Sequence, residues 1–328
     1  MKHVLVPGGA GYIGSHTVYA LINSGYKVIV VDNLETGFKQ AIHPDAVFYH
    51  GDIRDSAFIN SVLDNEHIDA VIHFAANSLV GESMTNPLKY YDNNLHGTRV
   101  LLDAMLKHEI KRIVFSSTAA TYGEPERIPI LETHRTNPTN TYGETKLAME
   151  RMFYWTQAAH GLKYVSLRYF NACGALPGGK IGEAHNPETH LIPIILQAAL
   201  GKRENIAIYG DDYPTRDGTC VRDYIHVDDL AQAHILAMEH LLNNGSSEIF
   251  NLGNGLGFTV KEVIEAAERV VGHPINQIIS PRRAGDPAQL VASSEKIIRM
   301  LNWQPKMPDI EAIVASAWAW HSTHPNGY

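Results

Sequence analysis

The chain has 328 residues, of which 45% are hydrophobic and 19% are charged, and its formal net charge is -8 at pH 7. This composition is typical of a folded globular protein of one or two domains and excludes a disordered chain. The acidic balance argues against a nucleic-acid-binding protein, because such surfaces carry net positive charge. The two cysteines lack the C-x-x-C spacing of a zinc motif. So few cysteines fit a reducing compartment.

The apolar segments of the chain are short. None reaches the length of about 18 residues that a membrane helix needs, so we expect no membrane span. The first apolar run, Val4–Val6, is broken by Pro7 and two glycines and is too short for a signal peptide. We therefore expect a cytoplasmic protein.

The first half of the chain alternates apolar runs with longer helical patterns. The runs predict strands over residues 4–7, 28–31, 47–50, 70–74, 113–116 and 164–168. Uniformly apolar strands separated by helices indicate a parallel sheet that is covered on both faces. The expected fold class is therefore α/β, with a doubly wound parallel sheet of the Rossmann type and a smaller C-terminal α/β substrate domain.

The pattern changes after about residue 172. Residues 174–188 are rich in Gly and Pro and predict a long loop, and the segments that follow alternate less regularly. Residues 219–252 are expected to return to the first domain. We predict a dinucleotide-binding domain over residues 1–172, with this return, and a nucleotide-sugar-binding domain over residues 173–328.

A glycine-rich loop follows the first predicted strand. Gly8, Gly11 and Gly14 have G-x-x-G-x-x-G spacing and open a predicted helix. Glycines allow a tight turn and bring backbone N–H groups close to a pyrophosphate. The motif alone also fits an ordinary turn. However, the second strand ends in Asp32, which can accept hydrogen bonds from ribose hydroxyls and would repel a 2′-phosphate, so the sequence predicts NAD rather than NADP.

Two further features extend this prediction. Asp52 follows the third strand, where it either accepts a hydrogen bond from the adenine amino group or caps a helix. Tyr142 and Lys146 lie four residues apart in a helix expected over residues 140–159, so they share one face. A neighbouring ammonium lowers the pKa of a phenol from about 10.

A Tyr-x-x-x-Lys pair is often only an exposed phenol and a solvated lysine. Here the fifth strand ends in Ser116-Ser117-Thr118, which brings a hydroxyl toward the same crevice. A hydroxyl, a phenol and an amine beside a dinucleotide form a site for proton transfer in alcohol–ketone chemistry.

These motifs together resemble the extended branch of the short-chain dehydrogenase/reductase superfamily and, within it, the UDP-glucose 4-epimerase family. Further similar stretches are Val80-Gly81-Glu82-Ser83, Arg168-Tyr169-Phe170-Asn171, residues 218–227 and residues 282–286. The resemblance spans nearly the whole chain. It implies reversible 4-epimerisation of UDP-galactose and UDP-glucose through a 4-keto intermediate, with transient hydride transfer to bound NAD, and it implies a homodimer.

The resemblance also implies roles for single residues. Tyr142 is implied as the base for the sugar 4′-hydroxyl, Lys146 as the group that holds the nicotinamide ribose, and Thr118 as the hydroxyl that bonds the 4′-oxygen. The implied NAD contacts are Gly8, Gly11, Tyr12, Ile13, Gly14, Asp32, Asn33, Asp52, Ile53, Phe74, Ala75, Ala76, Asn93, Ser116, Tyr142, Lys146 and Tyr169. The implied UDP-sugar contacts are Thr118, Tyr142, Asn171, Leu191, Tyr209, Arg222, Arg283, Asp286 and Leu290.

Three alternatives stay open. Leu290 stands where relatives carry a bulky Tyr or a small Cys, so action also or mainly on UDP-N-acetylhexosamines is an alternative. A 4,6-dehydratase would need an Asp-Glu pair after the active-site Thr, but Ala119-Ala120 follows here. A non-catalytic NAD-binding regulator would be free to lose the phenol or the amine, and both are present.

Four histidines could suggest a metal ion. They are His185, His190, His321 and His324. No H-E-x-x-H pattern exists, and their spacings offer no carboxylate partner. We therefore expect ordinary loop and tail histidines and no metal.

Overall fold

The computed structural model describes residues 1–283 and 286–328; Ala284 and Gly285, which belong to the similar stretch 282–286, lie outside the described residues. Its main element is a seven-stranded sheet in the order β11-β6-β5-β4-β1-β2-β3, with every neighbouring pair parallel. The strands are β1 (His3–Pro7), β2 (Lys27–Asp32), β3 (Val47–His50), β4 (Ala70–His73), β5 (Arg112–Ser116), β6 (Lys163–Tyr169) and β11 (Glu248–Leu252). The doubly wound parallel sheet is thus confirmed.

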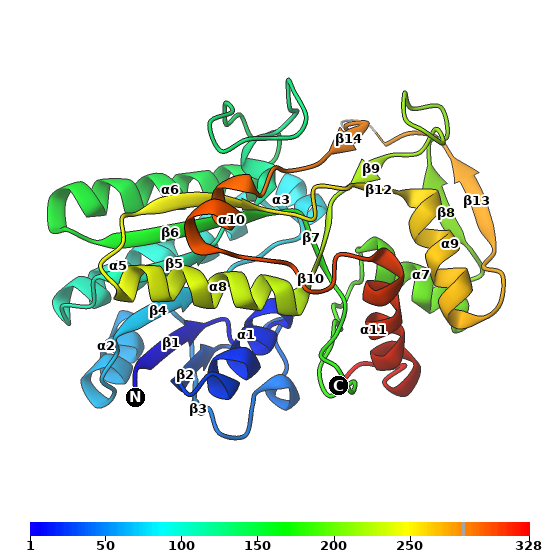
Figure 1. The fold of residues 1–328 in the computed structure, drawn as a ribbon. Coiled ribbons are helices and arrows are strands. Elements are labelled where there is room, and N and C mark those ends of the chain that lie inside the picture. Colours follow the sequence, from blue (N-terminus) through cyan, green and yellow to red (C-terminus); the bar gives the residue numbers. More distant parts are fainter. Residues whose placement is uncertain (284–285) are drawn as a thin grey trace.

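Helices cover both faces of this sheet (Figure 1), because alternate strand residues point to opposite sides. Val4 and Val6 of β1 pack in one apolar cluster, and Leu5 packs in the other. The first cluster includes residues of α1 (Tyr12–Asn23), α8 (Val227–Leu242) and α10 (Glu295–Leu301). The second includes residues of α2 (Ser56–Asn65), α5 (Gly97–Lys107) and α6 (Thr141–His160).

The helix expected over residues 140–159 is α6, and its ends have clear local causes. Asn140 caps its start, because its side chain accepts a hydrogen bond from the N–H of Gly143 at 2.8 Å. Gly161 ends it in the left-handed region, with φ at +70°. The strand β11 was not predicted; it pairs with β6 at one edge of the sheet.

A second group of elements lies at one end of the molecule (Figure 1). There, α7 (Leu191–Ala199), α9 (Val260–Val271) and α11 (Ile310–Thr323) pack with β8 (Ile206–Tyr209) around one apolar core, and β8 pairs in parallel with β13 (Gln277–Ser280). Short strands connect this group to the sheet: β7 (Asn171–Cys173) with β10 (Tyr224–His226), and β9 (Val221–Arg222) with β12 (Phe258–Thr259) and β14 (Gln289–Leu290). Among the described residues, no helix combines the length and the apolar character that a bilayer crossing requires.

Several short helices follow the strand ends. They are η1 (Lys39–Ala41), α3 (Val80–Thr85), α4 (Pro87–Tyr90) and η3 (Ala119–Thr121). A helical turn of the rare π type, η2 (Tyr91–His96), precedes α5. Such turns are frequent at functional sites. Here the turn carries Asn94, whose side chain accepts from the N–H of Asn77 at 2.7 Å and donates to the hydroxyl of Thr145 at 3.2 Å.

Candidate active site

A cleft of about 970 Å³ lies at the carboxyl ends of the parallel strands, and we refer to it as the strand-end cleft. It includes the point where the strand order reverses, between β1 and β4. Ligands of doubly wound sheets bind at this point. The volume is in the range of small-molecule and cofactor sites.

The structure brings nearly all predicted site residues to this cleft. Every residue expected to contact NAD lines it. Six of the eight expected sugar contacts besides Tyr142 line it as well, namely Thr118, Asn171, Arg222, Arg283, Asp286 and Leu290. Leu191 and Tyr209 do not line it in the described part of the chain. Leu191 begins α7 and packs against the apolar core there, and the Tyr209 ring lies under the guanidinium of Arg283, 4.6 Å from it.

In the glycine turn, the fold itself requires glycine at Gly8 and Gly14 but not at Gly11. A Cβ at Gly14 would lie 2.1 Å from the carbonyl oxygen of Gly8, and one at Gly8 would lie 2.5 Å from the N–H nitrogen of Ala75. A Cβ at Gly11 would meet only the Gly8 oxygen, at 3.4 Å. Gly11 is also the N-cap residue of α1, so no side chain caps the start of this helix. The first N–H groups of α1 are therefore available to an anionic ligand in the cleft.

Two aspartates lie at the ends of β2 and β3. Asp32 accepts hydrogen bonds from the N–H groups of Ala10 and Leu34, at 3.0 and 2.8 Å. Asp52 accepts from Arg54, whose hydrogen bonds outweigh burial and lower the pKa of Asp52 to about 2. The alternative that Asp52 caps a helix is wrong, because α2 is capped by Asp55.

Tyr142 and Lys146 both face the end of β5 from α6. The Lys146 ammonium donates to the carbonyl oxygen of Ser116 at 2.8 Å and lies 5.8 Å from the ring centroid of Tyr142. Burial lowers the pKa of Lys146 to about 7. Burial also raises the pKa of Tyr142 to about 12, against a smaller opposite effect of the Thr118 hydroxyl. In the protein by itself, burial therefore outweighs the predicted lowering of the phenol pKa, and the further effect of a nicotinamide cation stays a prediction.

A buried ion pair that the sequence did not suggest lies behind this site. Glu150, one further turn along α6, accepts two hydrogen bonds from Arg168 of β6 and one from the hydroxyl of Ser117. Both side chains of the ion pair are 4% exposed. The pair joins α6 to β6 and to the end of β5, two helical turns after Tyr142. Its signal in the sequence is the spacing of four between Tyr142, Lys146 and Glu150.

The opposite wall of the cleft is cationic. Arg222 of β9 donates to the carbonyl oxygens of Val221 and Pro287, both at 2.9 Å. Arg283 donates to the carboxylate of Asp286 at 2.8 Å, and Asp286 also lies 3.7 Å from Arg222. These two arginines come from distant segments and meet around one carboxylate. Guanidinium pairs of this kind suit a diphosphate.

The loop before α7 adds cleft residues that the sequence reasoning missed. Glu183, His185 and His190 line the cleft. The expectation that these histidines lack carboxylate partners is wrong, because Glu183 and Glu188 alternate with them and contact them. The sequence pattern that indicates this cluster is the alternation of Glu and His over residues 183–190. His321 is buried in α11, and His324 stacks on Trp320.

The sheet, the glycine turn and the Tyr142–Lys146 pair define an enzyme class, the dinucleotide-dependent short-chain dehydrogenases/reductases. The sequence model of the NAD dependent epimerase/dehydratase family matches residues 4–253. The chain is 62% identical over 325 residues to the UDP-glucose 4-epimerase of Halalkalibacterium halodurans, covering 99% of this chain and 97% of that one. The chain therefore belongs to the NAD dependent epimerase/dehydratase family, as the resemblance implied.

Solved structures agree with this family. The UDP-glucose 4-epimerase of Brucella ovis in complex with NAD is 46% identical, with a TM-score of 0.95, covering 97% of this chain and 98% of that one. The UDP-glucose 4-epimerase of Bifidobacterium longum in complex with NAD+ and UDP is 42% identical, with a TM-score of 0.94, covering 100% of each chain.

Proposed function

We propose that this protein is an NAD-dependent UDP-glucose 4-epimerase, an isomerase that interconverts UDP-galactose and UDP-glucose through a 4-keto intermediate. The observation that carries the proposal is that one cleft contains the glycine turn, the Tyr142–Lys146–Thr118 group and the arginine pair Arg222 and Arg283. A redox site and a diphosphate site in one cleft suit oxidation and reduction of a sugar joined to a diphosphate. The UDP-glucose 4-epimerase relatives support the same activity.

The residues of the cleft fit NAD. The N-terminus of α1 and Gly11 suit the pyrophosphate, and Asp32 suits the adenosine ribose and repels a 2′-phosphate. NAD bound there would supply a reversible hydride acceptor for sugar C4 and a positive ring charge beside Tyr142. Because it is regenerated in each cycle, we expect it to stay bound.

Tyr142 holds the proton that moves in each half of the reaction. The Thr118 hydroxyl orients the 4′-oxygen toward the phenol, and Tyr142 then takes the hydroxyl proton at its own oxygen. Positive charge must offset the burial that raises the pKa of Tyr142 to about 12, and Lys146, whose nitrogen lies 5.8 Å from the centroid of the phenol ring, supplies part of this charge when it is protonated. In the second half, Tyr142 returns the proton to the 4′-oxygen.

Arg222 and Arg283 hold the diphosphate while the 4-keto sugar turns over. Asp286, which contacts both arginines, keeps them oriented toward the cleft. The rest of the sugar wall is provided by Asn171 and Leu290. Leu191 and Tyr209 lie behind this wall and outside the cleft. The Tyr209 ring lies under the guanidinium of Arg283, and Leu191 is the first residue of the neighbouring helix α7.

Three further proposals concern organisation. We assign residues 1–172 and 219–252 to the dinucleotide domain, because α8 and β11 pack on and extend the main sheet. A homodimer would cover exposed apolar side chains of α4 and α6, which include Leu88 at 77% and Trp155 at 68% exposure.

Two buried free cysteines fit the cytoplasm.

The test is conversion of UDP-galactose by the purified protein without added NAD, followed by chromatographic separation of the UDP-sugars. The expected result is UDP-glucose, which supports the epimerase and a retained cofactor together. Product only after addition of NAD means a loosely held cofactor. No product even with added NAD contradicts the proposal, and parallel reactions with UDP-N-acetylgalactosamine then test the sugar.

A further inference from the structure

Four metal-binding side chains meet in the loop between β7 and α7. Glu183, His185, Glu188 and His190 each offer one nitrogen or carboxylate oxygen, and these four atoms all lie within 4.8 Å of one another. They alternate as Glu-x-His-x-x-Glu-x-His. None of them is used in the epimerase chemistry derived above.

The four ligand atoms lie close enough together to share one metal ion. The Nδ1 atom of His190 lies 2.9 Å from an oxygen of Glu183 and 2.9 Å from an oxygen of Glu188. The Nδ1 atom of His185 lies 3.0 Å from Glu183 and 3.8 Å from Glu188. Zinc ligands at 2.0–2.1 Å in a tetrahedron are separated from each other by about 3.3 Å. The three shorter separations are those of hydrogen bonds and ion pairs between these side chains, which a bound metal ion would replace.

The burial and charge of the cluster also favour bound positive charge. The side chains of Glu183 and Glu188 are each 4% exposed, although both are carboxylates. Buried carboxylates are paired with positive charge or coordinate metal ions. Neutral imidazoles and two carboxylates leave two negative charges, which one divalent cation balances.

We propose that Glu183, His185, Glu188 and His190 bind one zinc ion. Imidazole nitrogens disfavour magnesium and calcium, which prefer oxygen ligands, and a set of four protein ligands made of imidazoles and carboxylates suits zinc. Four protein ligands close the shell, as in structural rather than catalytic zinc sites.

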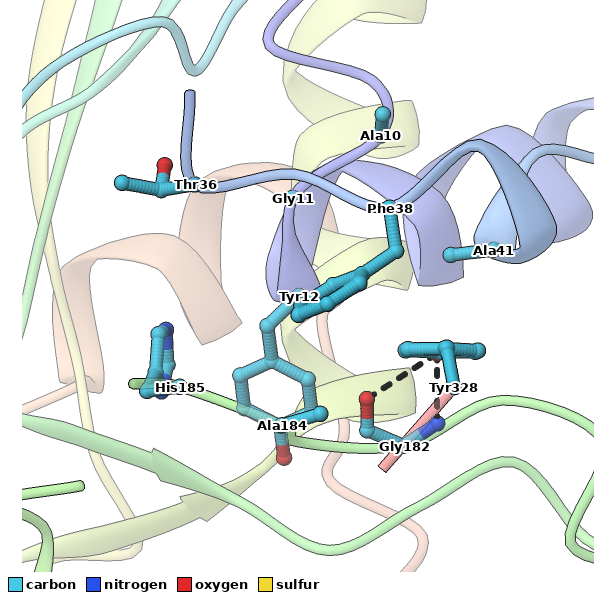
Figure 2. Close-up of a pocket in the computed structure, with 10 residues that line it drawn as sticks. All are labelled: Ala10, Gly11, Tyr12, Thr36, Phe38, Ala41, Gly182, Ala184, His185 and Tyr328. Atoms are coloured by element: carbon cyan, nitrogen blue, oxygen red, sulfur yellow. Dashed lines mark hydrogen bonds between the residues drawn. The ribbon is translucent and has the colours of Figure 1, made fainter. Parts of the chain in front are cut away.

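The zinc ion would fix the loop against the strand-end cleft. The His185 ring packs edge-on against Tyr12, which begins α1, and the Glu183 carbonyl accepts from the indole of Trp320 on α11. On the far side of Tyr12, the Tyr328 hydroxyl both accepts from and donates to the backbone of Gly182, as Figure 2 shows in a small pocket. The loop therefore spans both parts of the molecule, and a metal would hold its centre.

The test is zinc content by mass spectrometry of the intact enzyme, purified without chelators and dialysed. The expected result is about one zinc per chain for the wild type. Glu183→Gln and His190→Gln are expected to lose the metal, while the control His273→Gln, at an exposed loop histidine, keeps it. Circular dichroism establishes that each variant is folded.

Cobalt gives a second readout that needs no variant. Wild-type protein stripped of metal and loaded with Co²⁺ is expected to show the strong visible absorption of tetrahedral cobalt, and Zn²⁺ is expected to displace it. Wild-type protein without zinc that also fails to bind added Zn²⁺ overturns the proposal. Zinc that persists in folded Glu183→Gln and His190→Gln also overturns it. Metal content is measured without substrate, so this outcome is independent of the epimerase assignment.

Discussion

The ammonium of Lys146 donates a hydrogen bond to the carbonyl oxygen of Ser116 at 2.8 Å, and this bond ties α6 to the end of β5. Tyr142 lies one helical turn before Lys146, so the same bond fixes the phenol over the strand-end cleft. The spacing of Tyr142 and Lys146 predicts that both side chains lie on one face of the helix. It does not predict which part of the protein that face contacts.

Tyr142→Phe should fold and bind NAD but lose activity by roughly 10²–10⁴-fold, the usual contribution of a positioned proton-transfer group. UDP-galactose conversion at saturating substrate measures the loss. Tyr154→Phe, an exposed phenol on the same helix, is the matched control and should keep its activity. Near-normal turnover of Tyr142→Phe would refute the assignment of the base.

The buried Lys146 should make stability depend on pH. Its pKa is lowered from 10.5 to about 7 in the folded protein, so between these values the unfolded chain binds more protons. Stability should therefore rise with pH across this window, by up to about 1.4 kcal/mol per pH unit from this group. Below about pH 7 the full cost of burying the ammonium is present.

Urea unfolding of the NAD-free protein at several pH values from 7 to 10 measures this dependence. Lys146→Met removes the titrating group and should give a flatter profile than the wild type. Parallel profiles for the two proteins would show that Lys146 keeps an ordinary pKa.

Glu150→Gln should be strongly destabilising. The change leaves the guanidinium of Arg168 buried without its counter-charge, which costs about 3–5 kcal/mol. The comparison is Asp103→Asn, which removes the exposed i,i+4 ion pair with Arg99 and should cost less than about 1 kcal/mol. Urea unfolding at neutral pH measures both. Equal losses of stability in the two variants would contradict the expected cost of leaving Arg168 buried without its counter-charge.

The glycine turn should separate stability from cofactor binding. Gly14→Ala places a Cβ 2.1 Å from the Gly8 oxygen and should lower the melting temperature. Gly11→Ala meets ordinary contact distances in the protein and should fold normally, yet bind NAD more weakly, because the methyl group enters the pyrophosphate site. Calorimetric NAD titration and thermal melts test both variants. Unchanged NAD affinity of Gly11→Ala would contradict the placement of the pyrophosphate.

Arg283→Ala should raise the KM for UDP-galactose by about tenfold or more, because a charge-assisted hydrogen bond contributes roughly 1.5–3 kcal/mol. The neighbouring Arg282 bonds instead to Asp212 and lies over Tyr213, so Arg282→Ala is the matched control and should leave the KM unchanged. Initial rates over a range of substrate concentrations compare them. Equal KM values for the two variants would remove Arg283 from the diphosphate site.

Local patterns predicted the parallel sheet, because uniformly apolar runs and glycine spacing constrain the backbone without help from distant residues. The glycine turn, Asp32 and the Tyr142–Lys146 pair, also found by local patterns, line one cleft, whereas most of the other expected NAD contacts came from the family resemblance. The strand β11 was missed, because Glu248 and Asn251 interrupt its apolar pattern and its place in the sheet depends on pairing with β6. The pKa shifts of Tyr142 and Lys146 depend on burial, which no spacing reveals. Contacts between distant segments, such as Glu150 with Arg168, likewise form only in the folded chain.

The central claim is that hydrogen leaves sugar C4 and returns to it within the closed site. UDP-galactose carrying deuterium at C4, converted in ordinary water, tests this most directly by mass spectrometry and NMR of the product. We predict UDP-glucose that retains deuterium at C4, because the hydride stays on bound cofactor between the two steps. UDP-glucose with solvent hydrogen at C4 would contradict the claim and indicate proton abstraction at carbon.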